Sequence, residues 1–145
     1  MRLNMARLDG TLRASTLNAM DLSLCTACHC LAARRRARAV TRHFEAKLRP
    51  HGLRATQFSI LAALALAGPT PMGELARFLG LERTTLTRGA LLLERDGWVR
   101  NDRSPDGRER LLRLTASGRR KLESAYPAWK AAQDSLATVK IPEGK

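Results

Sequence analysis

Three cysteines and a histidine stand together near the start of the chain, and these residue types are suited to covalent and metal chemistry. The run is Cys25-Thr26-Ala27-Cys28-His29-Cys30, and it holds every cysteine of the 145-residue sequence. If the run is helical, Cys25, Cys28 and His29 share one face at positions i, i+3 and i+4, whereas Cys30 points elsewhere. The spacing therefore predicts a small thiol cluster on one side of a helix.

This thiol cluster fits three interpretations, which the sequence alone leaves open. Free cysteine is often a small buried apolar residue, so the three thiols can simply pack in a dimer region. They can instead sense oxidants, because an oxidised thiol pairs with a neighbouring one, and the nearby charges of Arg34 and Arg35 favour the reactive thiolate. We expect no metal. The alternative is a soft-metal site whose ligands are Cys25, Cys28, His29 and Cys30.

A second group of side chains is suited to nucleic acid rather than to covalent chemistry. Arginine binds guanine and phosphate through two parallel hydrogen bonds, and threonine offers a hydroxyl to phosphate and a methyl to thymine. The expected DNA contacts at the leading end of one helix are Arg83, Thr84, Thr85, Thr87 and Arg88. Those on the hairpin that follows are Arg103, Arg108 and Arg110.

The charge of the whole chain also points to a polyanionic partner. It has 26 Lys and Arg against 13 Asp and Glu, a formal net charge of +13. Such an excess attracts nucleic acid first and an anionic membrane surface second. The run Arg34-Arg35-Arg36-Ala37-Arg38 is interpreted as a solvated face, with contact to DNA phosphates as the alternative.

Several function classes have no support in the sequence. No apolar run approaches the roughly 18 residues needed to cross a bilayer, and no signal-peptide pattern begins the chain, so we expect a cytoplasmic protein without a membrane partner. No Ser-His-Asp set, phosphate loop or pair of carboxylates in a cleft is apparent. We therefore expect neither an enzyme nor a bound cofactor.

The elements that must position these side chains are mainly helical, since aromatic residues make up only 4% and alanine and leucine fill the apolar positions. Apolar residues at helical spacing predict helices over 22–48, 56–67, 72–79, 83–95 and 116–137. Thr56 and Thr115 are the expected N-caps of the second and last helices. Between residues 98 and 114 the apolar period changes to 2, which predicts two strands, 98–101 and 110–114, joined by a turn at Ser104-Pro105-Asp106-Gly107.

A helix, a glycine turn, a second helix and a hairpin together predict a winged helix-turn-helix fold in a mainly α protein. One of Asp102 and Asp106 is expected to pair with a wing arginine and fix its direction. The expected domains are an N-terminal arm (1–21), a dimerisation helix (22–55), the winged helix-turn-helix DNA-binding domain (56–114) and a C-terminal dimerisation helix (115–145).

Residues 72–118 resemble the MarR family of bacterial regulators (multiple antibiotic resistance regulator). The matching segments are 73–76, 91–99, 102–108 and 112–118, and the earlier helix segment 39–44 fits as well. The resemblance extends over about residues 22–136. It implies a homodimer on a pseudo-palindromic promoter site, usually repressing, and often released by a small ligand or by thiol oxidation. It also implies that Arg108 sits at the wing tip in the minor groove.

The resemblance weakens at the C-terminus, where the family continues into a further helix of the dimerisation region and this sequence stops at Lys145. We expect the segment before Leu22 to join the dimer interface instead, or the dimer to be weaker. Tyr126 and Trp129 either line a pocket for a small aromatic ligand or belong to the core. The alternative function is a basic nucleic-acid-binding protein that is indifferent to sequence.

Overall fold

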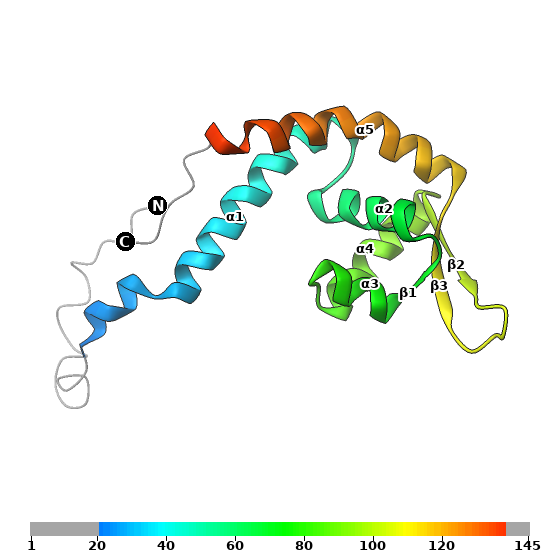
Figure 1. Ribbon diagram of the computed structural model, residues 1–145, viewed down its shortest axis with the longest axis horizontal. Helices are drawn as coiled ribbons and strands as arrows, with labels where there is room; N and C mark the ends of the chain where they lie inside the picture. The colour runs from blue at the N-terminus through cyan, green and yellow to red at the C-terminus, as the bar shows by residue number, and fades with distance from the viewer. Residues whose placement is uncertain (1–20, 139–145) are drawn as a thin grey trace. The chain divides into compact units, whose positions relative to one another are not determined.

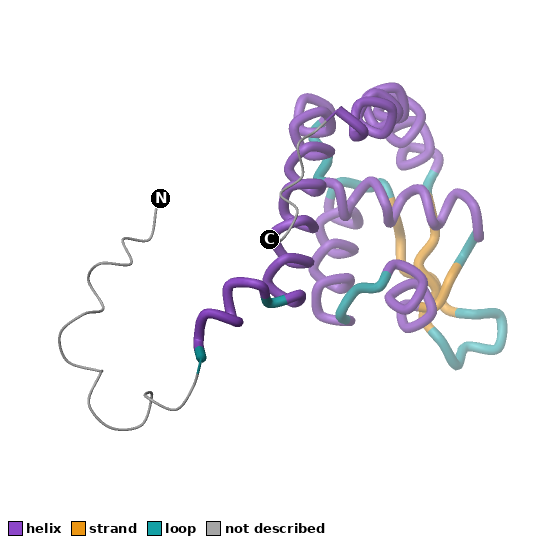
Figure 2. The backbone as a smooth tube through the Cα atoms, turned by 60° about the vertical axis from the view of Figure 1, so that its left-hand side comes forward, coloured by secondary structure: helices purple, strands orange, loops and turns teal. Residues whose placement is uncertain are grey.

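The computed structural model describes residues 21–138, which are mainly helical with one small sheet (Figures 1 and 2). Within this range the chain divides into two units, one reaching to Arg38 and the other starting at Ala39. The elements in chain order are the 3-10 helix η2 (Leu22–Ala27), α1 (His29–Leu48), the 3-10 helix η3 (Arg49–His51), α2 (Ala55–Ala67), β1 (Thr70–Pro71), α3 (Met72–Leu79), α4 (Arg83–Arg95), β2 (Val99–Arg103), β3 (Arg110–Leu114), α5 (Ala116–Ser135) and the 3-10 helix η4 (Leu136–Thr138).

The first unit begins with a short 3-10 helix rather than with the expected long α-helix. The prediction of one helix over 22–48 is wrong at its start, because η2 ends at Ala27 and the backbone of the next residue, Cys28, is extended (φ −61°, ψ 118°). Side chains explain the tighter winding. Asp21 accepts hydrogen bonds from the amide N–H and the hydroxyl of Ser23, and the Thr26 hydroxyl donates to the Ser23 carbonyl at 2.6 Å. Such local bonds compete with the α-helical pattern.

The second unit is built around α2, which carries buried side chains on much of its circumference. Ile60, Leu61 and Leu64 are almost completely buried. They belong to one buried cluster with leucines of α1, α3, α4 and β3, namely Leu48, Leu75, Leu86, Leu93 and Leu112. A helix that is apolar nearly all round belongs in a core, and burying each of these leucines contributes about 1.5–3 kcal/mol. Figure 1 shows α5 along one side of α2 and the pair α3–α4 along the other.

The expected cap of α2 is wrong by two positions. The helix begins at Ala55 with Arg54 as N-cap, and Thr56 lies inside its first turn. Gln57 explains the shift, because its side-chain oxygen accepts from the Arg54 amide at 2.9 Å. A glutamine at the third helical position satisfies that donor without a serine or threonine at the cap.

The sheet has three antiparallel strands in the order β1-β3-β2. The predicted strand over 110–114 is confirmed as β3, while the strand expected over 98–101 is found at Val99–Arg103, since its pairing with β3 continues to Arg103 opposite Arg110. The strand β1 was not predicted. It is only two residues long and exists through pairing with β3, in which the buried Thr70 lies opposite Leu112.

The two helices expected over 72–79 and 83–95 are confirmed as α3 and α4. Gly80 ends α3 in the left-handed conformation (φ 62°), and its amide donates to the carbonyls of Ala76 and Arg77. This conformation is easily adopted only by glycine. It lets α4 start three residues later, with Leu86, Ala90 and Leu93 buried. The opposite face of α4 is therefore left to solvent.

The helix α5 is fastened to the base of the hairpin. Thr115 is the N-cap as predicted: its hydroxyl oxygen accepts from the Gly118 amide at 3.0 Å and its hydroxyl donates to the Gly97 carbonyl at 2.7 Å. The Thr115 amide also donates to the Trp98 carbonyl at 3.1 Å. Gly118 is packed against Trp98 so closely that a Cβ atom would overlap the carbonyl oxygen of that residue.

Further along α5, the partly buried Trp129 packs against the core. Its ring stacks on Phe58 with centroids 5.6 Å apart and on the half-exposed Tyr126 at 5.7 Å.

His43 of α1 donates from Nε2 to the Ala132 carbonyl at 2.9 Å. Within residues 21–138, no helix is long and apolar enough to span a membrane.

Candidate nucleic-acid interface

The outer face of α4 presents the side chains that the sequence predicted as DNA contacts. All five are exposed: Arg83, Thr84, Thr85, Thr87 and Arg88. They are exposed because the inner face is fixed in the core by Leu86 and Leu93, which leaves the remaining positions of each turn outside. The first turn of α4 contains no acidic residue. Its free amide groups and its arginines therefore favour an anion at this end.

The three predicted arginines of the wing, Arg103, Arg108 and Arg110, are also exposed. The turn that carries Arg108 is held from within. Asp106 accepts from the Ser104 hydroxyl and from the Arg108 amide (3.2 Å), and the Gly107 amide donates to the Ser104 carbonyl at 2.8 Å. The Ser104 hydroxyl and then the Arg108 amide lower the pKa of the Asp106 carboxyl below its ordinary value. Asp106 is thus an ionised turn organiser rather than an ion-pair partner.

The expected pairing of an aspartate with a wing arginine is confirmed at Asp102. Its Oδ2 accepts from Arg100 Nε at 3.0 Å and from Arg113 Nε at 2.9 Å, which joins β2 to β3 across the sheet. The arginines Arg103, Arg108 and Arg110 take part in no ion pair with any residue of the range 21–138. Asp102 therefore stiffens the wing without neutralising the arginines at its tip.

A second connection joins the wing to α4. Glu94, near the end of that helix, accepts from the backbone amide of Asn101 at 3.3 Å and from its side-chain amide at 3.4 Å. These two hydrogen bonds, both accepted by Glu94, fix the position of β2 and the rotamer of Asn101. The start of the wing thus moves with α4.

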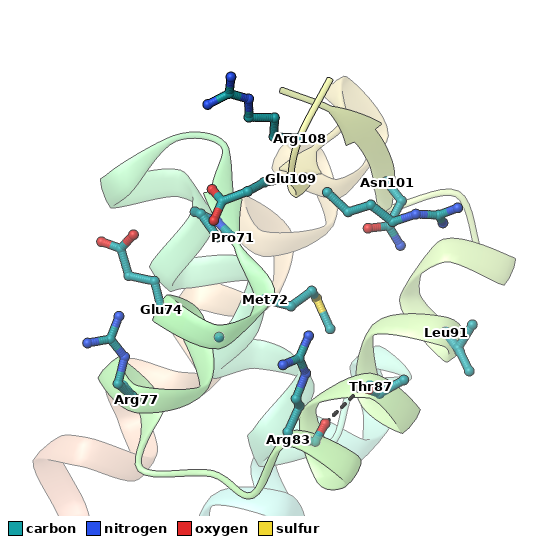
Figure 3. A pocket seen from close by; sticks show the side chains of 12 residues that line it. Pro71, Met72, Glu74, Arg77, Arg83, Thr87, Leu91, Asn101, Arg108 and Glu109 are labelled. Atoms are coloured by element: carbon teal, nitrogen blue, oxygen red, sulfur yellow. Dashed lines mark hydrogen bonds between the residues drawn. The ribbon is translucent and has the colours of Figure 1, made fainter. Parts of the chain in front are cut away.

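Between these elements lies a groove of about 750 Å³ (Figure 3). Arg83 and Thr87 of α4 line one wall and Arg108 and Arg110 of the wing line another. The remaining lining residues are Pro71, Met72, Gly73, Glu74, Arg77, Leu91, Asn101 and Glu109. In Figure 3 the hydroxyl of Thr87 donates to the Arg83 carbonyl, at 2.8 Å, so this hydroxyl can still accept a hydrogen bond from a ligand and the Thr87 methyl is free for apolar contact.

The groove brings together four of the eight predicted contacts. Thr84, Thr85, Arg88 and Arg103 are exposed on the same elements but do not line it. Sequence reasoning missed Arg77 and Asn101, which do line it. Arg77 stands on the exposed side of α3 opposite the buried Leu75 and Ala76, so its helical phase would have marked it as exposed. Nothing in the sequence marked Asn101, because its place depends on Glu94.

Comparison with known proteins adds to this geometry. The model of the MarR family matches residues 51–109, which span α2 to the wing. A solved structure of the M. tuberculosis transcriptional regulator MosR in complex with DNA has a TM-score of 0.69 and 43% identity. The alignment with MosR covers 78% of this chain and 84% of the MosR chain. The chain belongs to the MarR family. The resemblance that the sequence suggested is therefore confirmed, and so is the winged helix-turn-helix fold.

Two further relatives of this MarR-family chain are informative. The uncharacterized HTH-type transcriptional regulator YwoH of Bacillus subtilis (strain 168) is 36% identical over 87 residues, which are 60% of this chain and 64% of that protein. The chain thus matches less than two thirds of the length of this curated relative. The structure of reduced AbfR bound to DNA has a TM-score of 0.63 and 28% identity, and it covers 70% of this chain and 75% of that one.

The cysteines of this MarR-family protein lie in the first unit. Cys25 is in η2, Cys28 is the extended residue after it, and Cys30 is in α1; all three are free and exposed. The expectation that Cys25, Cys28 and His29 share a helical face is wrong, because the helix is interrupted at Cys28. Across residues 21–138, no three His, Cys, Asp or Glu side chains are grouped so as to hold a metal ion. The soft-metal alternative therefore gains no support.

Proposed function

We propose that this chain is a DNA-binding regulator of transcription that inserts α4 into the major groove and lays the wing along the adjacent minor groove. The observation that carries the proposal is the groove in which Arg83 and Thr87 face Arg108 and Arg110. A major groove about 12 Å wide admits one α-helix, and a narrow minor groove attracts arginine through its negative potential. The solved MosR complex with DNA supports the same partner for this chain.

The two sets of contacts have different tasks in this proposal. The exposed residues of α4, Arg88 above all, read base edges, because arginine grips guanine at two atoms. Arg108, presented by the turn that Asp106 and Gly107 hold, enters the minor groove and contributes affinity on most sequences. Arg103 and Arg110 contact phosphates beside it.

We further propose that the chain acts as a homodimer on a pseudo-palindromic promoter site and represses transcription there. A two-fold dimer binds two half-sites separated by one helical turn of DNA or a multiple of it. The segments assigned to the dimer are 22–55 and 115–145, with 56–114 as the DNA-binding domain and 1–21, which lies almost entirely outside the described residues, as an arm. MarR-family regulators are generally dimeric, which supports this division.

Release from DNA follows either from a small ligand or from cysteine oxidation. Cys25, Cys28 and Cys30 are exposed, so oxidants reach them. Peroxide oxidises one thiolate to a sulfenic acid and is itself reduced to hydroxide; a second thiol then displaces water to form a disulfide. AbfR, of which reduced and overoxidized forms have been solved bound to DNA, is a related protein that supports the redox route.

The experiment that tests the proposal compares affinity for a selected duplex with affinity for random duplexes. The full chain is incubated with a pool of random DNA, bound duplexes are recovered, and the recovered sequence is titrated against scrambled duplexes of equal length. We expect the selected sequence to bind at least about 10³ times more tightly at fixed salt. Equal affinities with a steep salt dependence would instead establish the sequence-indifferent nucleic-acid-binding protein.

A further inference from the structure

The first half of α1 carries a dense cluster of arginines that the groove does not use. Four of the five residues from 34 to 38 are arginine, and all four are exposed: Arg34, Arg35, Arg36 and Arg38. None of them forms an ion pair or a hydrogen bond through its side chain with any residue of the range 21–138. Their positive charges are therefore neutralised by nothing in the described protein.

This arrangement destabilises the helix, because the arginines repel one another and form no ion pair within the range 21–138. Arg38 follows Arg34 by four positions and Arg35 by three, and like charges at these spacings repel each other on a helix. The first turn of α1 has no acidic residue, and the helix contains only one acid, Glu45, which lies 4.0 Å from Arg54 instead. No acidic side chain of the range 21–138 offsets this repulsion, so a partner that supplies negative charge would stabilise the helix.

We propose that the arginine surface of α1, defined as Arg34, Arg35 and Arg38, binds phosphates of double-stranded DNA as a second, sequence-independent contact region. The proposal rests on the proposed function and extends it. These three side chains share one side of α1, and Arg34 and Arg38 are about 6 Å apart along the axis. Duplex DNA carries one charge per roughly 1.7 Å of its axis, so each guanidinium finds a phosphate for bidentate hydrogen bonds.

The exposed Leu22 and Leu24 lie in η2, and the composition of α1 itself favours DNA over an anionic membrane. Helices that lie on a membrane need bulky apolar side chains opposite their basic face. Between His29 and Arg38, α1 has Leu31 as its only large apolar residue, and the other uncharged positions there are cysteine and alanine. A basic helix with so little apolar surface is matched to a hydrated polyanion.

The test is a salt titration of DNA affinity on the full chain. In the variant Arg34→Gln/Arg35→Gln/Arg38→Gln, the slope of log K against log salt concentration is expected to fall by up to about 2.7, since each lost phosphate contact removes about 0.9. The ratio of affinities for selected and random duplexes is expected to stay unchanged, because phosphates carry no sequence information.

A matched control removes the same charge elsewhere. Lys47→Gln/Arg49→Gln/Arg54→Gln takes three exposed positive charges from outside both contact regions. Equal slopes for the two triple variants would overturn the proposal while leaving the proposed function intact. A wild-type chain without any preference for the selected duplex would overturn the proposed function instead, and that readout is independent of the salt slope.

Two further measurements keep the test decisive. Thermal unfolding is expected to show the arginine variant at least as stable as the wild type, because the repulsion along α1 is relieved. The variant Arg34→Lys/Arg35→Lys/Arg38→Lys keeps the charge, and its salt slope is expected to match the wild type. Loss of binding to phosphatidylserine vesicles with an unchanged DNA slope would assign the surface to membranes and overturn the proposal.

Discussion

The close approach of Gly118 to the hairpin makes the variant Gly118→Ala a demanding test of the fold. A Cβ atom there would overlap the Trp98 carbonyl oxygen and lie 2.8 Å from both the Trp98 carbonyl carbon and Leu114 Cδ1. The Trp98 oxygen is a backbone atom, and it already accepts from the Thr115 amide at 3.1 Å. The new methyl group therefore forces the first turn of α5 away from the hairpin.

The expected loss of stability follows from these contacts. Overpacking a filled site costs about 1–3 kcal/mol. Displacing Thr115 also weakens its bonds to Trp98 and Gly97, each contributing about 1 kcal/mol. Replacing a helical glycine with alanine returns about 0.5–1 kcal/mol. The net destabilisation is about 2–4 kcal/mol, which lowers the midpoint of thermal unfolding by roughly 7–13 °C.

The assay is urea and thermal unfolding followed by circular dichroism, with Gly73→Ala as the matched control. Gly73 is also helical, and no atom lies within 4 Å of the position that its Cβ would take. That substitution is expected to stabilise the protein by about 0.4–1 kcal/mol. If Gly118→Ala is as stable as Gly73→Ala, the close packing of α5 on the hairpin, and the reasoning built on it, is refuted.

Three further predictions concern the interface and the thiols. Arg88→Ala is expected to relax base preference at one position by about 1–3 kcal/mol, whereas Arg108→Ala weakens binding to selected and random duplexes alike; titrations of both variants against single-base substitutions distinguish these effects. Because the folded-state pKa of Asp106 is depressed, its contribution to the turn is present above about pH 3.9 and is lost as pH falls through the lower folded value. The amide resonance of Arg108 is expected to report this titration in wild type and not in Asp106→Asn. Replacing all three cysteines by serine is expected to abolish any effect of peroxide on operator binding, and an undiminished peroxide effect would place the sensor elsewhere.

The elements that were predicted correctly are those whose position depends on residues close to them in the sequence. The helices α3 and α4 follow from apolar residues at helical spacing on either side of Gly80. The helix α5 begins directly after Thr115, because the hydroxyl oxygen of that N-cap accepts a hydrogen bond from an otherwise free amide of the first turn. The hairpin follows from the change of apolar period and the turn residues around Gly107. These signals lie within a few residues of the structure that they specify.

The elements that sequence reasoning missed depend on partners elsewhere in the chain or on competing local bonds. β1 is a strand only because β3 pairs with Thr70, forty-two positions before Leu112. The interruption at Cys28 results from hydrogen bonds of Asp21 and Thr26 that the apolar pattern does not register. Apolar periodicity finds buried faces, so it is insensitive to a turn made by exposed polar side chains.

The candidate site shows the same division. The helical phase set by Leu86 and Leu93 was enough to predict which α4 side chains are exposed. Which of them share a groove with the wing was not predictable, because it depends on how far the hairpin leans toward α4. That lean is set by the hydrogen bonds of Asn101 to Glu94, which join residues of two different elements.

The bond between Glu94 and Asn101 also determines which partner must deform when DNA is bound. Because α4 and the wing are joined at their base, they keep a nearly fixed separation. The duplex must therefore adapt the widths of its grooves to that separation. Bending and twisting energies of DNA depend on sequence, being low at pyrimidine–purine steps and high in A-tracts. Base pairs that lie between the sites contacted by α4 and by the wing would then influence affinity through the stiffness of the duplex alone, even where no side chain touches them.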